Sequence, residues 1–134
     1  MKDFKFRAWI KAKKEMQMVD FLDFRYNKIG LNNEEYLKEF SNCELMQYTG
    51  LKDKHGVEIY EGDIIKAKTV MESMPIWIGE VMRECDYMGI DKNEGAEWVI
   101  VDKKLGSYIA FYPKQDREII GNIFENSELL EEQK

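Results

Sequence analysis

One stretch of the sequence, LMQYTGLKDKHGVEIYEGDIIKAK at residues 45–68, concentrates side chains that could do chemistry. It contains the single histidine of the chain, several carboxylates and a threonine hydroxyl. Carboxylates and an imidazole can hold a metal ion or exchange protons, and a threonine can serve as a nucleophile when a base activates it. The residues of such a site would be Thr49, Asp53, His55, Glu58, Glu61 and Asp63.

The same residue types are those that tight turns require. Asp53 can accept hydrogen bonds from amides further along the chain, and Gly56 can take the positive φ that closes a turn. Gly50 would end a strand, and Gly62 with Asp63 would begin the next structural element. A lone histidine completes neither a two-histidine metal site nor a nucleophile–base pair. We therefore interpret the stretch as structural and expect no catalytic residue, no metal ligand and no cofactor.

Motifs of common enzymes are absent from the rest of the sequence. The patterns GxxxxGK[ST], GxGxxG and GxSxG do not occur. The sequence therefore gives no support to an ATP-dependent enzyme, a dinucleotide-dependent enzyme or a serine hydrolase. We expect a protein that is not an enzyme.

Length and composition describe a small globular protein. The 134 residues are 44% hydrophobic and 34% charged, and they suit two subdomains, residues 1–56 and 57–134, or one integrated domain. No apolar run is long enough to cross a bilayer, and the basic start lacks the apolar core of a signal peptide. Cys43 and Cys85 are isolated, as in reducing compartments. We expect a cytoplasmic protein without a membrane partner.

The first part of the chain predicts a small α+β unit. FKFRAWIK at residues 4–11 alternates strictly between apolar and other residues, which is typical of a strand. The β-compatible run EMQMVDFLDFRYN follows after KAKKE, so the two runs can form a hairpin. LNNEEYLKEFS then offers a capping asparagine, acidic residues and an apolar stripe, which predict a short helix near residues 33–41.

The second part predicts a small antiparallel barrel. Five β-rich runs, DIIKAK, IWIGEVMRE, EWVIVDKK, SYIAFYP and EIIGNIFE, follow the Gly62–Asp63 pair at intervals that leave no room for intervening long helices. The pattern resembles an SH3-like barrel with five strands, on which the N-terminal part would dock. Glycines inside the runs, such as Gly121 beside Asn122, indicate bulges or barrel corners.

The charge is uneven along the chain and bears on nucleic-acid binding. Residues 1–70 carry 13 basic and 12 acidic side chains (+1), whereas residues 71–134 carry 7 and 14 (−7). Arg7, Trp9 and Lys11 would share one strand face, where an indole could stack on a base while the cations hold phosphates. The alternative is that Trp9 packs on its own protein. The acidic second part opposes a phosphate backbone, so we do not favour a nucleic-acid partner.

A semi-apolar segment, MESMPIWIG, precedes the second predicted barrel strand. Met74, Pro75 and Trp77 are either core residues or an adaptable contact surface, and Trp77 could simply fill the barrel. The chain has 7 Phe, 7 Tyr and 3 Trp, more large apolar surface than two small subdomains readily hide. We expect a homo-oligomer, in a ring or dihedral assembly, with this segment as the candidate contact.

Three segments together resemble the YopX family of small proteins from phages and prophages of Gram-positive bacteria. They are FKFRAW, LMQYTGLKDKHGVEIYEGDII and IIGNIFENSELLE, which occur in the order of the family and span nearly the whole chain. The resemblance implies a phage accessory protein inside a bacterial host and transfers no catalytic residue. We expect a non-enzymatic module that binds itself or a host or phage protein. A nucleic-acid-associated phage protein that uses the basic N-terminal hairpin is the alternative.

Overall fold

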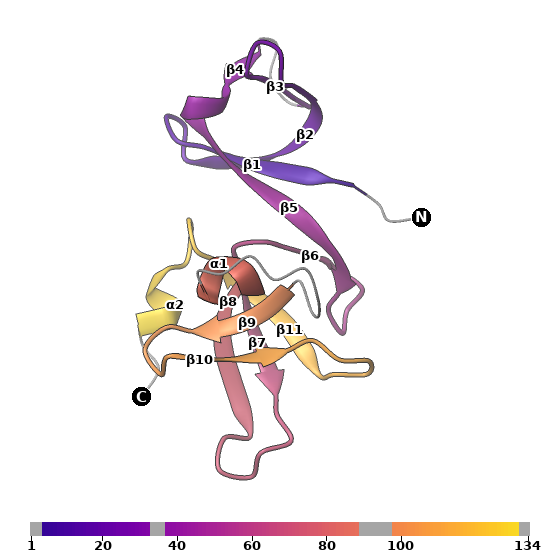
Figure 1. The fold of residues 1–134 in the computed structure, drawn as a ribbon, viewed down its shortest axis with the longest axis vertical. Helices are drawn as coiled ribbons and strands as arrows, with labels where there is room; N and C mark the ends of the chain where they lie inside the picture. The colour runs from indigo at the N-terminus through magenta and orange to yellow at the C-terminus, as the bar shows by residue number, and fades with distance from the viewer. Residues whose placement is uncertain (1–3, 33–36, 89–97, 132–134) are drawn as a thin grey trace. The chain divides into compact units, whose positions relative to one another are not determined.

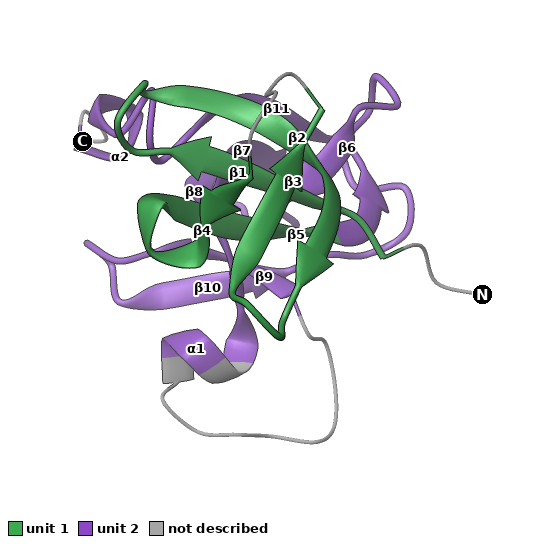
Figure 2. Ribbon diagram, turned by 90° about the horizontal axis from the view of Figure 1, so that it is seen from above, with its two compact units in different colours: residues 1–48 green, residues 49–134 purple. Residues whose placement is uncertain are grey.

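The computed structural model of the chain describes residues 4–32, 37–88 and 98–131. These residues are mainly β and form two antiparallel sheets with little helix (Figure 1). The chain divides into two compact units, residues 1–48 and 49–134 (Figure 2). The boundary expected after residue 56 would have placed the turn at Asp53 in the first unit, whereas this division places it in the second. No helix of the described residues is long and apolar enough to span a membrane.

The first unit holds most of a six-stranded sheet of strand order β4-β3-β2-β1-β5-β6. Its elements are β1 (Phe6–Ile10), β2 (Glu15–Asp23), β3 (Lys28–Leu31), β4 (Lys38–Glu39), the 3-10 helix η1 (Phe40–Asn42) and the first part of β5 (Cys43–Lys52). The expected hairpin is confirmed, because β1 pairs with β2 from Arg7 opposite Met18 to Ile10 opposite Glu15. β5 continues from the first unit into the second.

The helix predicted near residues 33–41 is wrong in the part of that span that the structure describes. Lys38 pairs with Ile29 and Glu39 pairs with Lys28, so β4 extends the sheet where the helix was expected. A single 3-10 turn, η1, follows, and its N-cap residue makes no side-chain capping bond. The pairing partners lie in another strand, and such long-range hydrogen bonds override local helix preference. The first part of the chain is therefore a β unit as far as it is described.

The second unit contains a five-stranded antiparallel sheet of strand order β10-β9-β8-β7-β11. Each of the five apolar runs predicted to be a strand forms one. The elements are β6 (Glu58–Tyr60), β7 (Asp63–Lys68), β8 (Ile76–Arg83), α1 (Glu84–Met88), β9 (Trp98–Asp102), β10 (Ser107–Ala110), β11 (Arg117–Asn122) and α2 (Glu128–Glu131). The last strand, β11, returns to pair with β7, the first strand of this sheet in the sequence. β6 belongs instead to the six-stranded sheet, where it pairs with β5.

Each unit has its own apolar core. Branched and aromatic side chains supply both cores, as they do in most sheets that bury one face. The first core contains Ala8, Ile10, Ile29, Leu31 and Cys43. The second core contains Ile59, Ile65, Ala67, Trp77, Val81, Trp98 and Ile100.

Two glycines inside strands have different causes. At Gly121 the pairing of β11 with β7 shifts register between Ile119 and Gly121, which confirms the expected bulge. At Gly79 a Cβ atom would lie 2.5 Å from the carbonyl oxygen of Val101, so only glycine allows the backbones of β8 and β9 to approach this closely. Both glycines thus shape the sheet.

Candidate functional site

Asp53 is the centre of the stretch that could have been catalytic, and its carboxylate is fully used in hydrogen bonds to backbone amides. One oxygen, Oδ1, accepts bonds from the amides of His55 at 2.9 Å and Val57 at 3.0 Å. The other, Oδ2, accepts a bond from the amide of Ile119 at 3.2 Å. Gly56 takes a φ of 81° and donates its amide to the Asp53 carbonyl, which completes the expected turn. A carboxylate held in this way ties backbone segments together.

The surroundings of Asp53 shift its pKa in opposite directions. Burial raises the pKa by removing water from the carboxylate, while the amide bonds from Val57, Ile119 and His55 and the charge of the His55 ring lower it. The net pKa lies below the ordinary value. Asp53 is therefore ionised at neutral pH, which suits an acceptor of amide hydrogen bonds and not a proton donor.

Arg117 of β11 lies near the same turn, and no local sequence pattern indicated its role. Its Nε donates to the Lys52 carbonyl at 2.9 Å, and its Nη1 donates to the Tyr112 carbonyl at 3.1 Å. The guanidinium also lies 5.2 Å from the centre of the Phe111 ring. Burial lowers the pKa of Arg117, and the charge of Asp53 opposes that shift. The guanidinium therefore links the end of β5 to the segment before β11.

His55 has no arrangement that would make it a catalytic base. Its Nε2 lies 3.8 Å from the Glu118 carboxylate, and its side chain is more than half exposed. Lys54 competes for the same carboxylate at 3.5 Å and also pairs with Asp116 at 3.6 Å. Exposed ion pairs of this kind contribute little to stability and fix no reactive geometry.

The remaining members of the candidate site have structural partners. Thr49 Oγ1 donates to the Ile59 carbonyl at 2.7 Å and accepts the Leu51 amide, so its hydroxyl joins β5 to β6. Glu58 accepts a long bond from the Tyr60 hydroxyl at 3.4 Å, and Glu61 is half-buried. Within residues 4–32, 37–88 and 98–131, no group of three His, Cys, Asp or Glu side chains could hold a metal ion. The Thr49 hydroxyl and the Glu58 carboxylate thus bond to other groups of the same chain.

Gly62 and Asp63 sit at the start of β7, where an entry to the second sheet was expected. Asp63 is 2% exposed, and its Oδ2 accepts the Tyr60 amide at 2.8 Å. Gly62 has a φ of 85°, donates its amide to the Val81 carbonyl and accepts the Ile123 amide. The pair therefore holds the chain between β8 and the segment after β11.

The other predicted structural positions lie in turns or irregular strands. Gly50 takes a φ of 84° inside β5, two residues before the strand ends, and nothing lies within 4 Å of where a Cβ would be. Asn122 Oδ1 accepts the amides of Phe124 at 3.0 Å and Glu125 at 2.9 Å, which turns the chain after β11. These residues therefore shape the backbone.

Arg7, Trp9 and Lys11 form a short row along β1 and the turn after it, and Glu44 lies beside Lys11. Strand alternation puts Arg7 and Trp9 on one side of β1, and Lys11 follows in the turn directly after the strand. Lys11 pairs with Glu44 at 3.4 Å and donates to the Ser41 carbonyl, so part of its charge is neutralised. Cross-strand neighbours of Trp9 are Met16 and Glu44, which are not phosphate ligands. The row remains a candidate nucleic-acid contact and nothing in its geometry strengthens it.

The candidate contact segment before β8 divides between core and surface. Trp77 is 4% exposed and donates its indole N–H to the Ile100 carbonyl at 3.2 Å, so it fills the core of the second unit. Met74 packs partly against that core, whereas Pro75 is exposed. The exposed apolar side chains of this region are instead Val70, Met71 and Ile76.

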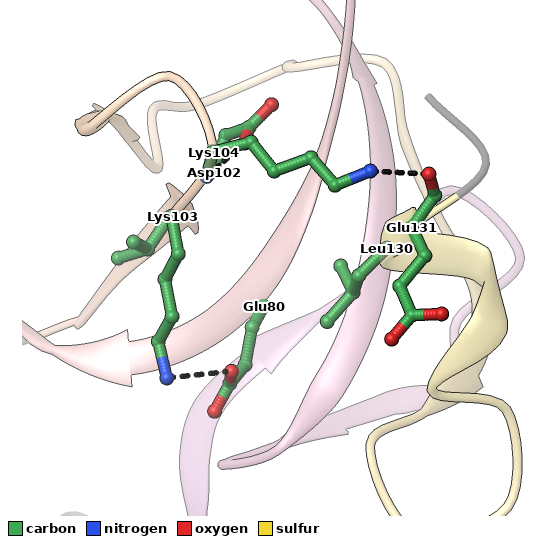
Figure 3. Close-up of a pocket in the computed structure, with 7 residues that line it drawn as sticks. Glu80, Asp102, Lys103, Lys104, Leu130 and Glu131 are labelled. Atoms are coloured by element: carbon green, nitrogen blue, oxygen red, sulfur yellow. Dashed lines mark hydrogen bonds and ion pairs between the residues drawn. The ribbon is translucent and has the colours of Figure 1, made fainter. Parts of the chain in front are cut away.

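A small open pocket of about 180 Å³ lies between α2 and the edge of β8 and β9 (Figure 3). The two lysines of the pocket both bond to groups of the same chain. Lys103 pairs with Glu80 at 3.5 Å, and Lys104 donates its ammonium to the Glu131 carbonyl. Asp102 Oδ1 accepts the Lys104 amide at 2.9 Å and the Leu105 amide at 3.1 Å. The bond from Lys104 to the Glu131 carbonyl ties α2 to the turn after β9.

Comparison with known proteins gives a family and a similar structure. The profile described as YopX protein matches residues 5–131. No curated protein matches the sequence. The crystal structure of protein EF1440 from Enterococcus faecalis is similar, with a TM-score of 0.57 and 25% sequence identity over 97% of this chain and 99% of that chain. The match covers both units.

Proposed function

The chain belongs to the YopX family, and we propose that it is a phage or prophage accessory protein that works as a non-enzymatic protein-interaction module. It would act in the cytoplasm of a bacterial host and associate with itself, with a host or phage protein as a further partner. The carboxylates of Asp53, Asp63 and Asp102 support this proposal, because each accepts hydrogen bonds from backbone amides of the same chain.

The strand order of the second unit supports an SH3-like barrel as its architecture. Four strands follow one another in the sheet as they do in the sequence, and the fifth strand returns to pair with the first. A small five-stranded barrel has this strand order when its sheet is laid flat, with β10 and β11 as the two end strands. Short strands of this kind serve mainly as a platform for loops, and loops carry most binding functions.

The observation that carries the proposal is the loop between β7 and β8. Val70 is 88% exposed, and Met71 and Ile76 are about half exposed, although all three are apolar. Thr69 holds the loop in place, because its hydroxyl donates to the Met74 carbonyl and its amide donates to the Pro75 carbonyl. A preorganised loop with exposed apolar side chains loses less entropy on binding than a flexible one. We assign this loop, residues 69–76, as the self-contact.

Light scattering behind size exclusion tests this assignment. We expect the wild-type protein at micromolar concentration to have a mass that is a multiple of 15.9 kDa. The double substitution Val70→Asp and Met71→Asp should lower that mass, because carboxylates resist burial in an apolar contact. Glu72→Ala, in the same loop, is the matched control and should leave the mass unchanged. A wild-type mass of one chain at all concentrations would contradict self-association.

A further inference from the structure

The turn between β2 and β3 presents aromatic side chains to solvent on a fixed backbone. Phe24 is 72% exposed and Tyr26 is 63% exposed, although exposed turns usually carry polar residues. Asp23 Oδ1 accepts the amides of Arg25 at 2.9 Å and Tyr26 at 3.2 Å, which holds one side of the turn. On the other side the Asn27 carbonyl accepts the Phe40 amide at 2.9 Å. The aromatic side chains therefore project from a rigid support.

Phe21 adds a third exposed ring to the same hairpin. The ring is 51% exposed and lies over Gly30 of β3, where a Cβ would be only 2.2 Å from its Cε1 atom. The next residue, Leu22, packs against the core on the opposite face of β2. A glycine at position 30 thus lets an aromatic ring lie on the outer face of the sheet. We call Phe21, Phe24 and Tyr26 together the aromatic hairpin.

The aromatic hairpin exposes more apolar surface to water than a single hairpin of a monomeric protein usually does. An aromatic side chain offers about 200 Å², so the exposed fractions of these rings leave roughly 350–400 Å² open to water. Exposed apolar area of a few hundred square ångströms on one hairpin is typical of a binding surface. Two copies packed together would cover roughly 700–800 Å² of apolar ring surface, to which the polar rim adds.

The charges around the aromatic hairpin are balanced. Between residues 20 and 32 and between residues 37 and 40 there are three basic and three acidic side chains, and Lys28 and Glu39 form an ion pair. A balanced rim does not attract a phosphate backbone or an anionic lipid surface. Two copies of the hairpin can therefore pack against each other without net charge repulsion between their rims.

We propose that the aromatic hairpin is a second self-association surface, at which two copies of the chain pack their hairpins against each other around a two-fold axis. The proposal rests on the self-association proposed above and adds a contact distinct from the loop at residues 69–76. An isologous contact uses the same residues from both copies, and the number of chains in the assembly is then even. Phe, Tyr and Arg, the residue types at this turn, are those enriched at the centres of interfaces.

Site-specific photo-crosslinking separates the two contacts. Phe24 and, in a second protein, Met71 are each replaced by p-benzoylphenylalanine, and ordinary and 15N-labelled chains are mixed before irradiation. We expect crosslinks between chains from position 24, mapped to residues 21–40 of the other copy. Phe24→Ser with Tyr26→Ser should also halve the mass in light scattering. Phe4→Ser, which removes another exposed ring of the first unit, should not.

Each outcome decides one of the two proposals. Crosslinks between chains from position 71 without any from position 24 would overturn the hairpin contact and leave the loop contact standing. Crosslinks from position 24 to residues outside 21–40 would overturn the two-fold arrangement. Crosslinks from position 24 within residues 21–40, with none from position 71, would support the hairpin and overturn the loop. The crosslinking proteins keep a large aromatic or apolar group at each position, so the result does not depend on whether the serine variant folds.

Discussion

The carboxylate of Asp53 accepts a hydrogen bond from the backbone amide of Ile119, a residue 66 positions further along the chain. The same carboxylate holds the turn between β5 and β6 through the amides of His55 and Val57. One side chain thus fastens a local turn to the last strand of the second sheet. Neither segment alone would fix the other's position.

The stability of the protein should depend on the ionisation of Asp53. Its folded-state pKa lies below its ordinary value, so its contribution is fully present above the unfolded-state pKa of about 4 and is lost as the pH falls through the folded-state pKa. Asp53→Asn should lower the free energy of unfolding by about 2 kcal/mol at pH 7, because charge-assisted bonds to amides are lost. The difference from wild type should shrink as the pH falls below the unfolded-state pKa and through the folded-state pKa.

Urea denaturation at pH 7 and at pH 2.5 measures this effect. Asp116→Asn is the control, because Asp116 is partly exposed and makes only surface ion pairs with Lys54 and Lys68. It should change stability by less than about 0.5 kcal/mol. An Asp53→Asn variant with the same deficit at both pH values would show that the charge is not what matters.

Asp63 and Gly62 should both be required for stability. Asp63→Ala leaves the buried Tyr60 amide without an acceptor and should cost about 2 kcal/mol. Gly62→Val forces a branched side chain to a φ of 85° and should cost a similar amount. Thermal unfolding by circular dichroism checks both, with the exposed Glu72→Ala as reference. Two variants as stable as wild type would contradict a structural role for this pair.

Gly79→Ala should be among the most damaging single-methyl substitutions in the chain. The new Cβ would lie 2.5 Å from the Val101 carbonyl oxygen, and a paired backbone cannot move away as a side chain can. A cost of about 3 kcal/mol is expected for such overpacking. Gly50→Ala isolates the effect of positive φ, because nothing lies within 4 Å of its added Cβ, and should cost only about 1 kcal/mol. Equal losses in chemical denaturation would refute the steric explanation.

Binding of single-stranded DNA or RNA should be weak and sensitive to salt. The row of Arg7, Trp9 and Lys11 offers few phosphate contacts, and Lys11 is already paired with Glu44. Fluorescence anisotropy at physiological salt should show no submicromolar binding. Submicromolar binding that disappears in Trp9→Ala and persists in the hairpin variant Phe24→Ser would make the nucleic-acid hypothesis the better one.

Local patterns predicted much of the second unit. Alternation of apolar residues located its five strands, and turn chemistry identified the roles of Asp53, Gly56 and Gly62. Each of these signals lies within a few neighbouring residues. Turns and strands are specified largely by such short-range preferences, so a sequence is enough to find them.

Features that depend on distant partners were missed or misread. The predicted helix near residues 33–41 had plausible capping residues, yet Lys38 and Glu39 pair with β3. The residues around Trp77 in the sequence are typical of both protein cores and interfaces. Its burial in the core becomes visible only in the fold, where its indole N–H donates to the Ile100 carbonyl. Arg117 gains its role from carbonyls of Lys52 and Tyr112 that the fold brings together. The spacing of residues along the chain does not show which distant residues the fold brings into contact.

One strand, β5, runs without interruption through the boundary between the two units. Recombination that exchanged one unit for an unrelated module at residue 48 or 49 would cut a strand in the middle and leave both halves with unpaired amides. The two units are therefore poor candidates for independent shuffling between genomes. The match of one family model to residues 5–131, across both units, agrees with a chain that is kept as one frame.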